Sequence, residues 1–176
     1  NYSLARWKDA ESALGRPVLS NQVQFSLAHP GPLDDLVPYA ASAGRLVIAW
    51  SPLAQGLLSA RYSASNPPTG AVRRMNPIFL EENLKRAAGL LEALRDTAGT
   101  HDVTAAQVAL AWLVHQPAVV AIPGASSIAQ VEANAAAADI DLTDDEVAEL
   151  TAQARAFTAL GSLDAARGLA RARLRR

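Results

Sequence analysis

Three short apolar runs along the chain predict buried strands. They lie at residues 18–25, 45–50 and 119–122, and each is bounded by Pro, Gly or Ser. Runs this short between such breakers favour strands over buried helices. We therefore expect three strands.

Elsewhere, apolar residues recur three and four positions apart, as on one face of an amphipathic helix. The segments with this spacing are 33–43, 79–97, 104–115, 127–138 and 143–157. Three of them open with a Ser or Thr followed three residues later by Gln or Glu, the spacing of a capping box. These pairs are Thr104 with Gln107, Ser127 with Gln130, and Thr143 with Glu146. Gly44 predicts a left-handed C-cap after the first helix.

Strands that alternate with helices predict an α/β fold built from βα units with parallel strands. A complete TIM (β/α)8 barrel usually needs about 250 residues, whereas this chain has 176. Three strands cannot close a barrel, so the pattern indicates part of one. Residues 51–78 form a long connection rich in Ser, Pro and Gly, with a helical turn expected near 56–60. Loops of this length are often functional.

Composition excludes several classes of protein. The net charge of −1 gives no preference for nucleic acid or an anionic membrane. The chain has no cysteine, which excludes disulfides and thiolate chemistry. No apolar run approaches the roughly 20 residues that span a bilayer, and no signal peptide is visible, so we expect a cytoplasmic protein. The three histidines are too scattered for a metal signature, and we expect no metal site.

Charge is divided unevenly along the chain. Residues 158–176 hold five arginines and one aspartate, a net charge of +4, which leaves −5 for residues 1–157. We therefore predict a folded domain over 1–157 and an Arg-rich C-terminal tail over 158–176. A solvated helix end explains the tail, and so does contact with an acidic or phosphate-bearing partner.

The carboxyl ends of the predicted strands are the expected place for a ligand. Segments 20–22, 50–56 and 122–127 should meet there. The third runs from a strand directly into a helix, whose free N–H groups and dipole favour a phosphate. Simple capping by Ser127 and Gln130, with a tight turn at Gly124, explains the same residues.

Several polar and aromatic residues near the carboxyl ends of the predicted strands can be interpreted in two ways. Trp50 closes a strand, where its ring could stack on a flat heterocycle or simply pack. Asn21 and Gln22 lie within a strand and could bind a carboxamide or satisfy nearby backbone groups.

No titratable group suggests a catalytic site by itself. His29 lies in a loop, His101 is expected to face solvent, and His115 is expected in the core or at a helix end. The acidic pairs and runs at 81–82 and 144–146 are best explained as charge at helix N-termini.

Four motifs in this order resemble the C-terminal half of aldo-keto reductases. They are SNQVQF (20–25), AWSPLAQGLL (49–58), TAAQVALAW (104–112) and IPGAS (122–126). QVEAN (130–134) and LTDDEVAEL (142–150) continue the likeness, which covers residues 1 to about 157. The chain is most similar to the branch that includes the potassium-channel beta subunits. The resemblance implies the C-terminal portion of a TIM (β/α)8 barrel with about three parallel strands and their helices.

The same resemblance implies roles in binding NADP(H). Asn1 and Gln22 would hold the nicotinamide carboxamide, and Trp50 would stack on the ring. The residues matching the segment around the pyrophosphate are Ser51, Pro52, Leu53, Gln55 and Gly56, with Arg61 near the phosphates and Arg73 a looser match. Those matching the contacts with the adenosine end and its 2′-phosphate are Gly124, Ser126, Gln130 and Asn134.

The chain departs from the family pattern in two ways. The family usually has Glu directly before the residue equivalent to Asn134, where this chain has Ala133, and Glu132 would point elsewhere on a helix. The family also uses a tetrad of Asp, Tyr, Lys and His at the ends of earlier strands. If Asn1 ends the fifth strand, all four residues precede this chain, and no tyrosine or histidine here replaces them.

We therefore expect NADPH-dependent reduction of aldehydes or ketones to alcohols in a longer parent. This chain, which begins with Asn1 rather than Met, would be a fragment of that parent, without catalytic residues and inactive alone. Its partners would be a small carbonyl substrate and, through exposed half-barrel edges, other chains. The alternatives are an NADP(H)-binding or sensing module without turnover, and a non-functional remnant.

Overall fold

The sheet of this protein is open and parallel. The computed structural model describes residues 1–161, with Val72 and Arg74 described in their backbone alone. The strands are β1 (Ser20–Gln24), β2 (Leu46–Trp50) and β3 (Val119–Ala121), in that spatial order. All three lie within the predicted runs, so the predicted strands are confirmed.

The helices gather on one face of the sheet. Alternate residues Val23, Val47 and Val119 are buried beneath them, with α2 (Leu36–Ala43) against β2 and α6 (Ala105–His115) against β3. On the other face, the register aligns Gln22 with Ile48 and Ile48 with Val120, and these side chains are exposed or half-buried. Only one side of the sheet therefore belongs to the core of the described residues.

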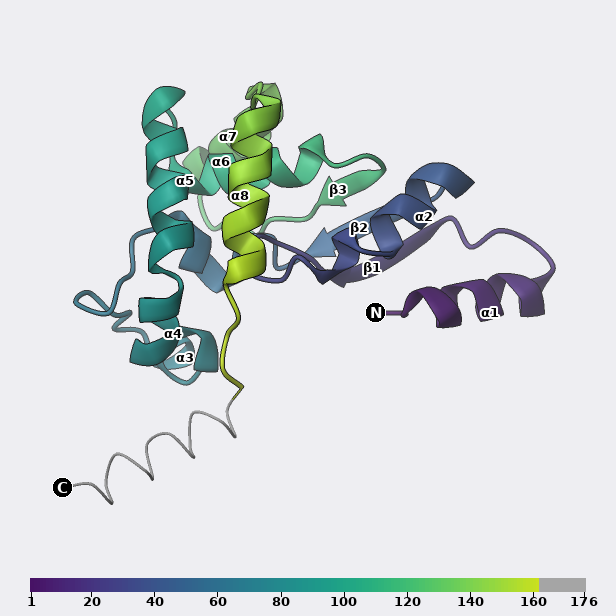
Figure 1. The fold of residues 1–176 in the computed structure, drawn as a ribbon, viewed down its shortest axis with the longest axis horizontal. Helices are drawn as coiled ribbons and strands as arrows, with labels where there is room; N and C mark the ends of the chain where they lie inside the picture. The colour runs from purple at the N-terminus through teal and green to yellow at the C-terminus, as the bar shows by residue number, and fades with distance from the viewer. Residues whose placement is uncertain (162–176) are drawn as a thin grey trace, which may run out of the picture.

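The core is largest where three helices meet at one end of the sheet. Figure 1 shows α5 (Ala88–Thr100) and α8 (Asp144–Ala156) beside each other there, close to α6. Trp112 of α6 is fully buried and meets Phe25 edge-to-face, with ring centroids 5.6 Å apart. Aromatic pairs in this geometry stabilise a core beyond the area they bury.

Helix α1 (Leu4–Leu14) lies at the opposite end of the molecule in Figure 1 and is held by one buried ring and one carboxylate. Trp7 is fully buried, and its Nε1 donates to the Val18 carbonyl at 2.9 Å. Glu11 accepts from the Tyr39 hydroxyl, from Arg45 Nε at 2.7 Å and from the Val18 amide at 2.9 Å. The bonds from Tyr39 and Arg45 hold the pKa of Glu11 down at about 2.

The helix ends agree with most of the predicted caps. Thr104 with Gln107 and Thr143 with Glu146 form complete capping boxes. Gly44 ends α2 in the left-handed conformation, with φ of 64°. The third box is only half correct, since Ser127 Oγ accepts from the Gln130 amide but the Gln130 side chain turns to Ser126 instead. It opens α7 (Ile128–Ala136), which continues into η4 (Ala137–Asp139).

The helix predicted over 79–97 is wrong as one piece. The structure has α4 (Glu81–Arg86) and α5 with a break at Ala87. Asn83 is fully buried and bonds to Pro77 and Leu160. These bonds join α4 to η3 (Pro77–Phe79) and to Leu160, while the leucines of α5 pack into the core.

Two further predictions needed adjustment. The helix predicted from 33 begins at Leu36, after a 3-10 turn η1 (Gly31–Leu33). The connection over 51–78 contains η2 (Ala54–Ser59), near the predicted turn, and also α3 (Ala71–Arg74) and η3 (Pro77–Phe79).

The predicted Arg-rich tail falls largely outside the described part of the chain. Its five arginines lie within 162–176, so the boundary near 157 stays a prediction. Within residues 1–161, no helix combines the length and apolar character needed to cross a membrane.

Candidate functional site

A groove of about 1030 Å³ lies between the loop after β2, the start of α3 and the N-termini of α6 and α7. This volume is at the upper end of small-molecule and cofactor sites, roughly 300–1,000 Å³. Ten of the thirteen predicted residues line it. They are Ser51, Pro52, Leu53, Gln55, Gly56, Arg61, Gly124, Ser126, Gln130 and Asn134. Of the three strand-end segments predicted to meet, those at 50–56 and 122–127 contribute to the groove, whereas no residue of 20–22 lines it.

The loop after β2 reaches the groove through an unusual backbone. Ser51, Ala54 and Gln55 have positive φ angles of 53°, 47° and 56°, and Gly56 has φ of 97°. A left-handed conformation costs a non-glycine residue about 1–2 kcal/mol, and such strain often accumulates at functional sites. Arg73 helps to hold the loop, because its Nε donates to the Gln55 carbonyl at 3.2 Å.

The electrostatics of the groove favour an anion. Among the described residues that line it, the charged side chains are Arg61 and Arg73, both cationic. The first turns of two helices also face it, α6 through Thr104 and Gln107 and α7 through the turn before it. Guanidinium groups and helix N-termini are the usual partners of phosphate in proteins.

The donors at the start of α7 are less free than expected. Gln130 Oε1 accepts from the Ser126 amide at 2.6 Å and from the Ser126 hydroxyl at 3.0 Å. The prediction of bare amides is therefore wrong for Ser126, because a side chain from the next turn reaches back to it. Ala133 and Asn134 line the groove while Glu132 is exposed and outside its lining, as the family departure implied.

The other three predicted residues meet beside the groove. The Asn1 ammonium donates to the Gln22 carbonyl at 2.6 Å, and Trp50 Nε1 donates to Asn1 Oδ1 at 2.7 Å. Trp50 is half-buried and directly precedes Ser51, which lines the groove. The structure thus places this cluster next to the loop that carries the predicted pyrophosphate contacts.

The two amides of β1 have different roles. Asn21 is buried on the helical face and brackets Tyr2, accepting from its amide at 3.1 Å and donating to its carbonyl at 2.8 Å. Gln22 is exposed on the other face of the sheet. Of the interpretations left open by the sequence, backbone satisfaction therefore holds for Asn21.

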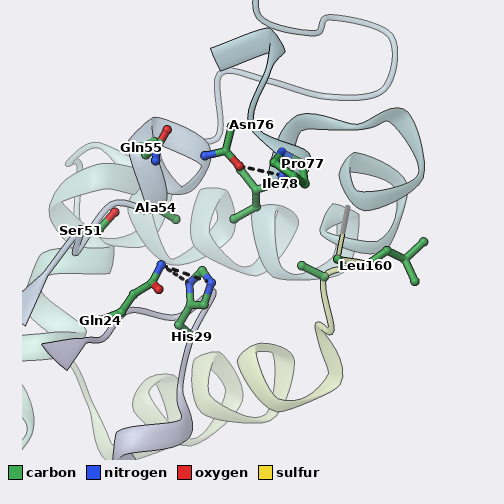
Figure 2. A pocket seen from close by; sticks show the side chains of 11 residues that line it. Gln24, His29, Ser51, Ala54, Gln55, Asn76, Pro77, Ile78 and Leu160 are labelled. Carbon is green, nitrogen blue, oxygen red and sulfur yellow. Dashed lines mark hydrogen bonds between the residues drawn. The ribbon is translucent and has the colours of Figure 1, made fainter. Parts of the chain in front are cut away.

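A second, smaller cavity adjoins the groove and was missed by sequence reasoning. It has a volume of about 330 Å³ and includes Gln24, His29 and Asn76 in its lining (Figure 2). Gln24 lies two residues beyond Gln22 on the same face of β1, which is the one signal that could have indicated it.

The remaining histidines belong to helix ends. His115 is exposed at the C-terminal end of α6, in line with one of its two predicted placements. The prediction that His101 faces solvent is wrong, because its Nε2 lies 2.9 Å from a Glu146 carboxylate oxygen and its side chain is only 21% exposed. Burial acts to raise the pKa of Glu146, but bonds from the Thr143 amide and from His101 outweigh it and lower that pKa.

The fold, the motifs and the groove together define a class of protein. The chain belongs to the Aldo/keto reductase family, whose sequence profile matches residues 1–155. The open sheet is the corresponding part of a TIM barrel, since solved aldo-keto reductases superimpose on it over about half of their own length. The predicted family and fold class are thus confirmed, while the likeness to the potassium-channel branch stays a prediction.

Among its relatives, an uncharacterized oxidoreductase of Mycobacterium bovis is 60% identical over 157 residues, which cover 89% of this chain and 48% of the relative. An aldo/keto reductase from Klebsiella pneumoniae, solved in complex with NADP and acetate, is 30% identical. It superimposes with a TM-score of 0.60 over 85% of this chain and 44% of its own. The glycerol dehydrogenase of Gluconobacter oxydans, at 21% identity, shares the fold with a TM-score of 0.77 over 92% of this chain and 50% of its own. The chain spans about half the length of the curated relatives it matches.

Proposed function

We propose that this chain is the NADP(H)-binding part of an oxidoreductase that reduces aldehydes or ketones to alcohols. The observation that carries the proposal is one groove that collects ten predicted cofactor residues, Arg61 among them, together with Arg73 and two helix N-termini. The Klebsiella pneumoniae neighbour, which was solved with NADP, supports the choice of cofactor. A cytoplasmic setting and a small carbonyl partner, as expected from the sequence, are part of this proposal.

The groove and the cluster beside it together supply groups that suit the parts of a dinucleotide. Arg61 and Arg73 supply positive charge for phosphates. Ser126 offers a hydroxyl and an amide to the 2′-phosphate once Gln130 turns aside. Trp50 offers an indole face for the nicotinamide, beside Asn1. The cofactor, when bound, supplies the hydride for carbonyl reduction.

We assign no catalytic acid to the described residues. The Tyr39 hydroxyl donates to Glu11, a bond that raises the pKa of Tyr39 and directs it toward α1. Tyr62 packs edge-to-face on Phe79, with ring centroids 5.4 Å apart. We infer that the proton donor comes from outside this chain and that the chain alone binds cofactor without turning it over.

The phosphate role is tested by comparing NADPH with NADH. The substitution Arg61→Ala should weaken NADPH binding about tenfold or more, which is the scale of a lost charge-assisted hydrogen bond. Ser126→Ala should weaken it roughly three- to tenfold. NADH, which lacks the 2′-phosphate, should be affected less by Ser126→Ala. Isothermal titration calorimetry measures the affinity of each variant for NADPH and for NADH.

The matched control is Arg86→Ala on α4, where Arg86 forms an exposed ion pair with Glu82 outside the groove. It should change neither affinity. If Ser126→Ala lowered the affinities for NADPH and NADH equally, the assignment of Ser126 to the 2′-phosphate would be wrong. If neither groove variant changed NADPH binding, the proposed function would be contradicted.

A further inference from the structure

The cavity beside the groove is built from five separate parts of the chain. Its lining comes from the end of β1, the loop that carries His29, the loop after β2, the residues around η3, and the segment 159–161. It shares Ser51 and Gln55 with the groove, so the two spaces meet at the strained loop after β2. The proposed cofactor contacts leave this second space unexplained.

One side of the cavity carries an amide and an imidazole that are only loosely paired. Gln24 Nε2 lies 3.5 Å from His29 Nδ1 and 3.4 Å from His29 Nε2 (Figure 2). A donor almost equally far from both ring nitrogens makes a straight hydrogen bond with neither. Both groups therefore retain capacity for a ligand. Burial lowers the pKa of His29, so its neutral ring offers one donor and one acceptor at neutral pH.

A second amide faces them across the cavity. Asn76 Oδ1 accepts from the Ile78 amide at 3.0 Å, which fixes the orientation of the side chain. Figure 2 shows the Asn76 nitrogen on the side away from that bond. Ala54, Pro77 and Ile78 supply apolar surface between the two amides. The cavity thus combines neutral hydrogen-bonding groups with a small apolar wall.

Asn83 fixes the walls relative to one another. This fully buried side chain donates to the Pro77 carbonyl at 2.8 Å and to the Leu160 carbonyl at 3.1 Å. It also accepts from the Leu160 amide at 2.8 Å. The η3 wall and the segment 159–161 are therefore held together before any ligand arrives, and a preorganised site has less ordering to do on binding.

The described lining of the cavity contains no side chain that carries a full charge at neutral pH. A carboxylate entering it would lose water without gaining a cationic partner, which is strongly unfavourable. Hydroxyl and carbonyl groups, in contrast, match the amides and the imidazole one for one.

We propose that this cavity binds the uncharged, hydroxyl-bearing end of the carbonyl substrate, with Gln24 and His29 as residues that determine its specificity. The assignment rests on the proposed function in one respect, because it takes the end of the cavity at Ser51, which directly follows Trp50, as the side where substrate and cofactor meet. Hydroxylated aldehydes and ketones are accepted, and keto acids are excluded.

The histidines of the chain provide the test. Imidazole resonances of the whole chain are followed by NMR while dihydroxyacetone or pyruvate, two small ketones that differ in charge, is added at constant pH and ionic strength. Dihydroxyacetone should shift the imidazole resonances of His29 until the site is saturated. The resonances of His101 and His115, which lie outside the cavity, should not shift. Pyruvate should bind about tenfold more weakly or worse.

Variants separate this site from general effects. Gln24→Ala should weaken dihydroxyacetone about fivefold, the scale of a lost hydrogen bond, and leave NADPH binding unchanged. The matched control is Gln153→Ala on α8, whose amide bonds to Glu149 at the surface. The proposal would be overturned if the His29 resonances did not shift with dihydroxyacetone, or if pyruvate shifted them equally. It would also be overturned if Gln153→Ala weakened dihydroxyacetone binding as much as Gln24→Ala.

The two proposals fail in different ways. A His29 response in a chain that does not bind NADPH supports the cavity and contradicts the cofactor assignment. NADPH binding with a silent His29 overturns the cavity and leaves the cofactor assignment in place.

Discussion

At the scale of single residues, Gly56 shows how the groove depends on backbone conformation. Its φ of 97° suits glycine, and a Cβ added there would lie 3.9 Å from the side chains of Arg73 and Tyr62, which leaves adequate space. Gly56→Ala should therefore act through backbone strain, costing about 1–2 kcal/mol or moving the loop. We expect lower stability to urea and weaker NADPH binding, measured by unfolding and by calorimetry.

Gly99→Ala in α5 is the control, because its expected effect on stability has the opposite sign. Gly99 has open space around its Cβ position and no positive φ, so alanine there should stabilise the helix by roughly 0.5–1 kcal/mol. If Gly56→Ala had the same free energy of unfolding and the same NADPH affinity as Gly99→Ala, the backbone conformation at Gly56 would have no role in the site.

At the scale of elements, the contact of α1 with α2 and with Arg45, just before β2, depends on an ionised carboxylate. The pKa of Glu11 falls from the ordinary 4.5 to about 2 in the folded chain. Its contribution to stability is therefore full above about pH 4.5 and disappears as the pH falls toward 2. Glu11→Gln should lower stability at pH 7 and flatten the loss of stability between pH 4.5 and 2.

Urea unfolding at a series of pH values measures this effect, with far-ultraviolet circular dichroism as the signal. Glu92→Gln is the comparison, because Glu92 is an exposed acid on α5. Identical pH dependence in both variants would mean that the bonds from Tyr39 and Arg45 do not stabilise the folded chain.

The sequence predicted the elements well wherever local signals decide them. Strand positions followed from apolar runs, and the boxes at Thr104 and Thr143 formed as expected. It failed where a distant contact intervenes. No local pattern records the bonds between Asn83 and Leu160, which lies 77 residues away, or the break in the helix at Ala87.

The same distinction applies to the candidate site. The motifs after β2 and β3 brought ten predicted residues into one groove, because parallel strands align their carboxyl ends. The second cavity was not predicted, since Gln24, Asn76 and the segment 159–161 meet only in the folded chain. The side chain of Gln130 was placed on the wrong neighbour, because both Ser126 and Ser127 offer it a donor.

At the scale of the whole molecule, the uncovered face of the sheet is the main feature. On and just after β3, Val120 and Ile122 are 40% and 47% exposed. Apolar surface of this kind is typical of a site for protein association, and the association expected from the sequence stays a prediction.

The expected activity of the chain depends on where the proton donor lies. We expect the chain alone to bind NADPH without oxidising it when aldehydes or ketones are added, since we propose that the proton donor lies outside it. The loss of NADPH absorbance with time measures this, with an intact aldo-keto reductase as the positive control. Turnover comparable to that enzyme would show that a residue within this chain donates the proton.

The reach of Gln130 back to Ser126 has a kinetic consequence for the proposed cofactor. Its carboxamide already accepts from the Ser126 amide and hydroxyl, and both residues are exposed. A phosphate that binds Ser126 must first displace this carboxamide, which can return as the phosphate leaves. We therefore expect the turn to favour rapid exchange of nucleotide over long residence.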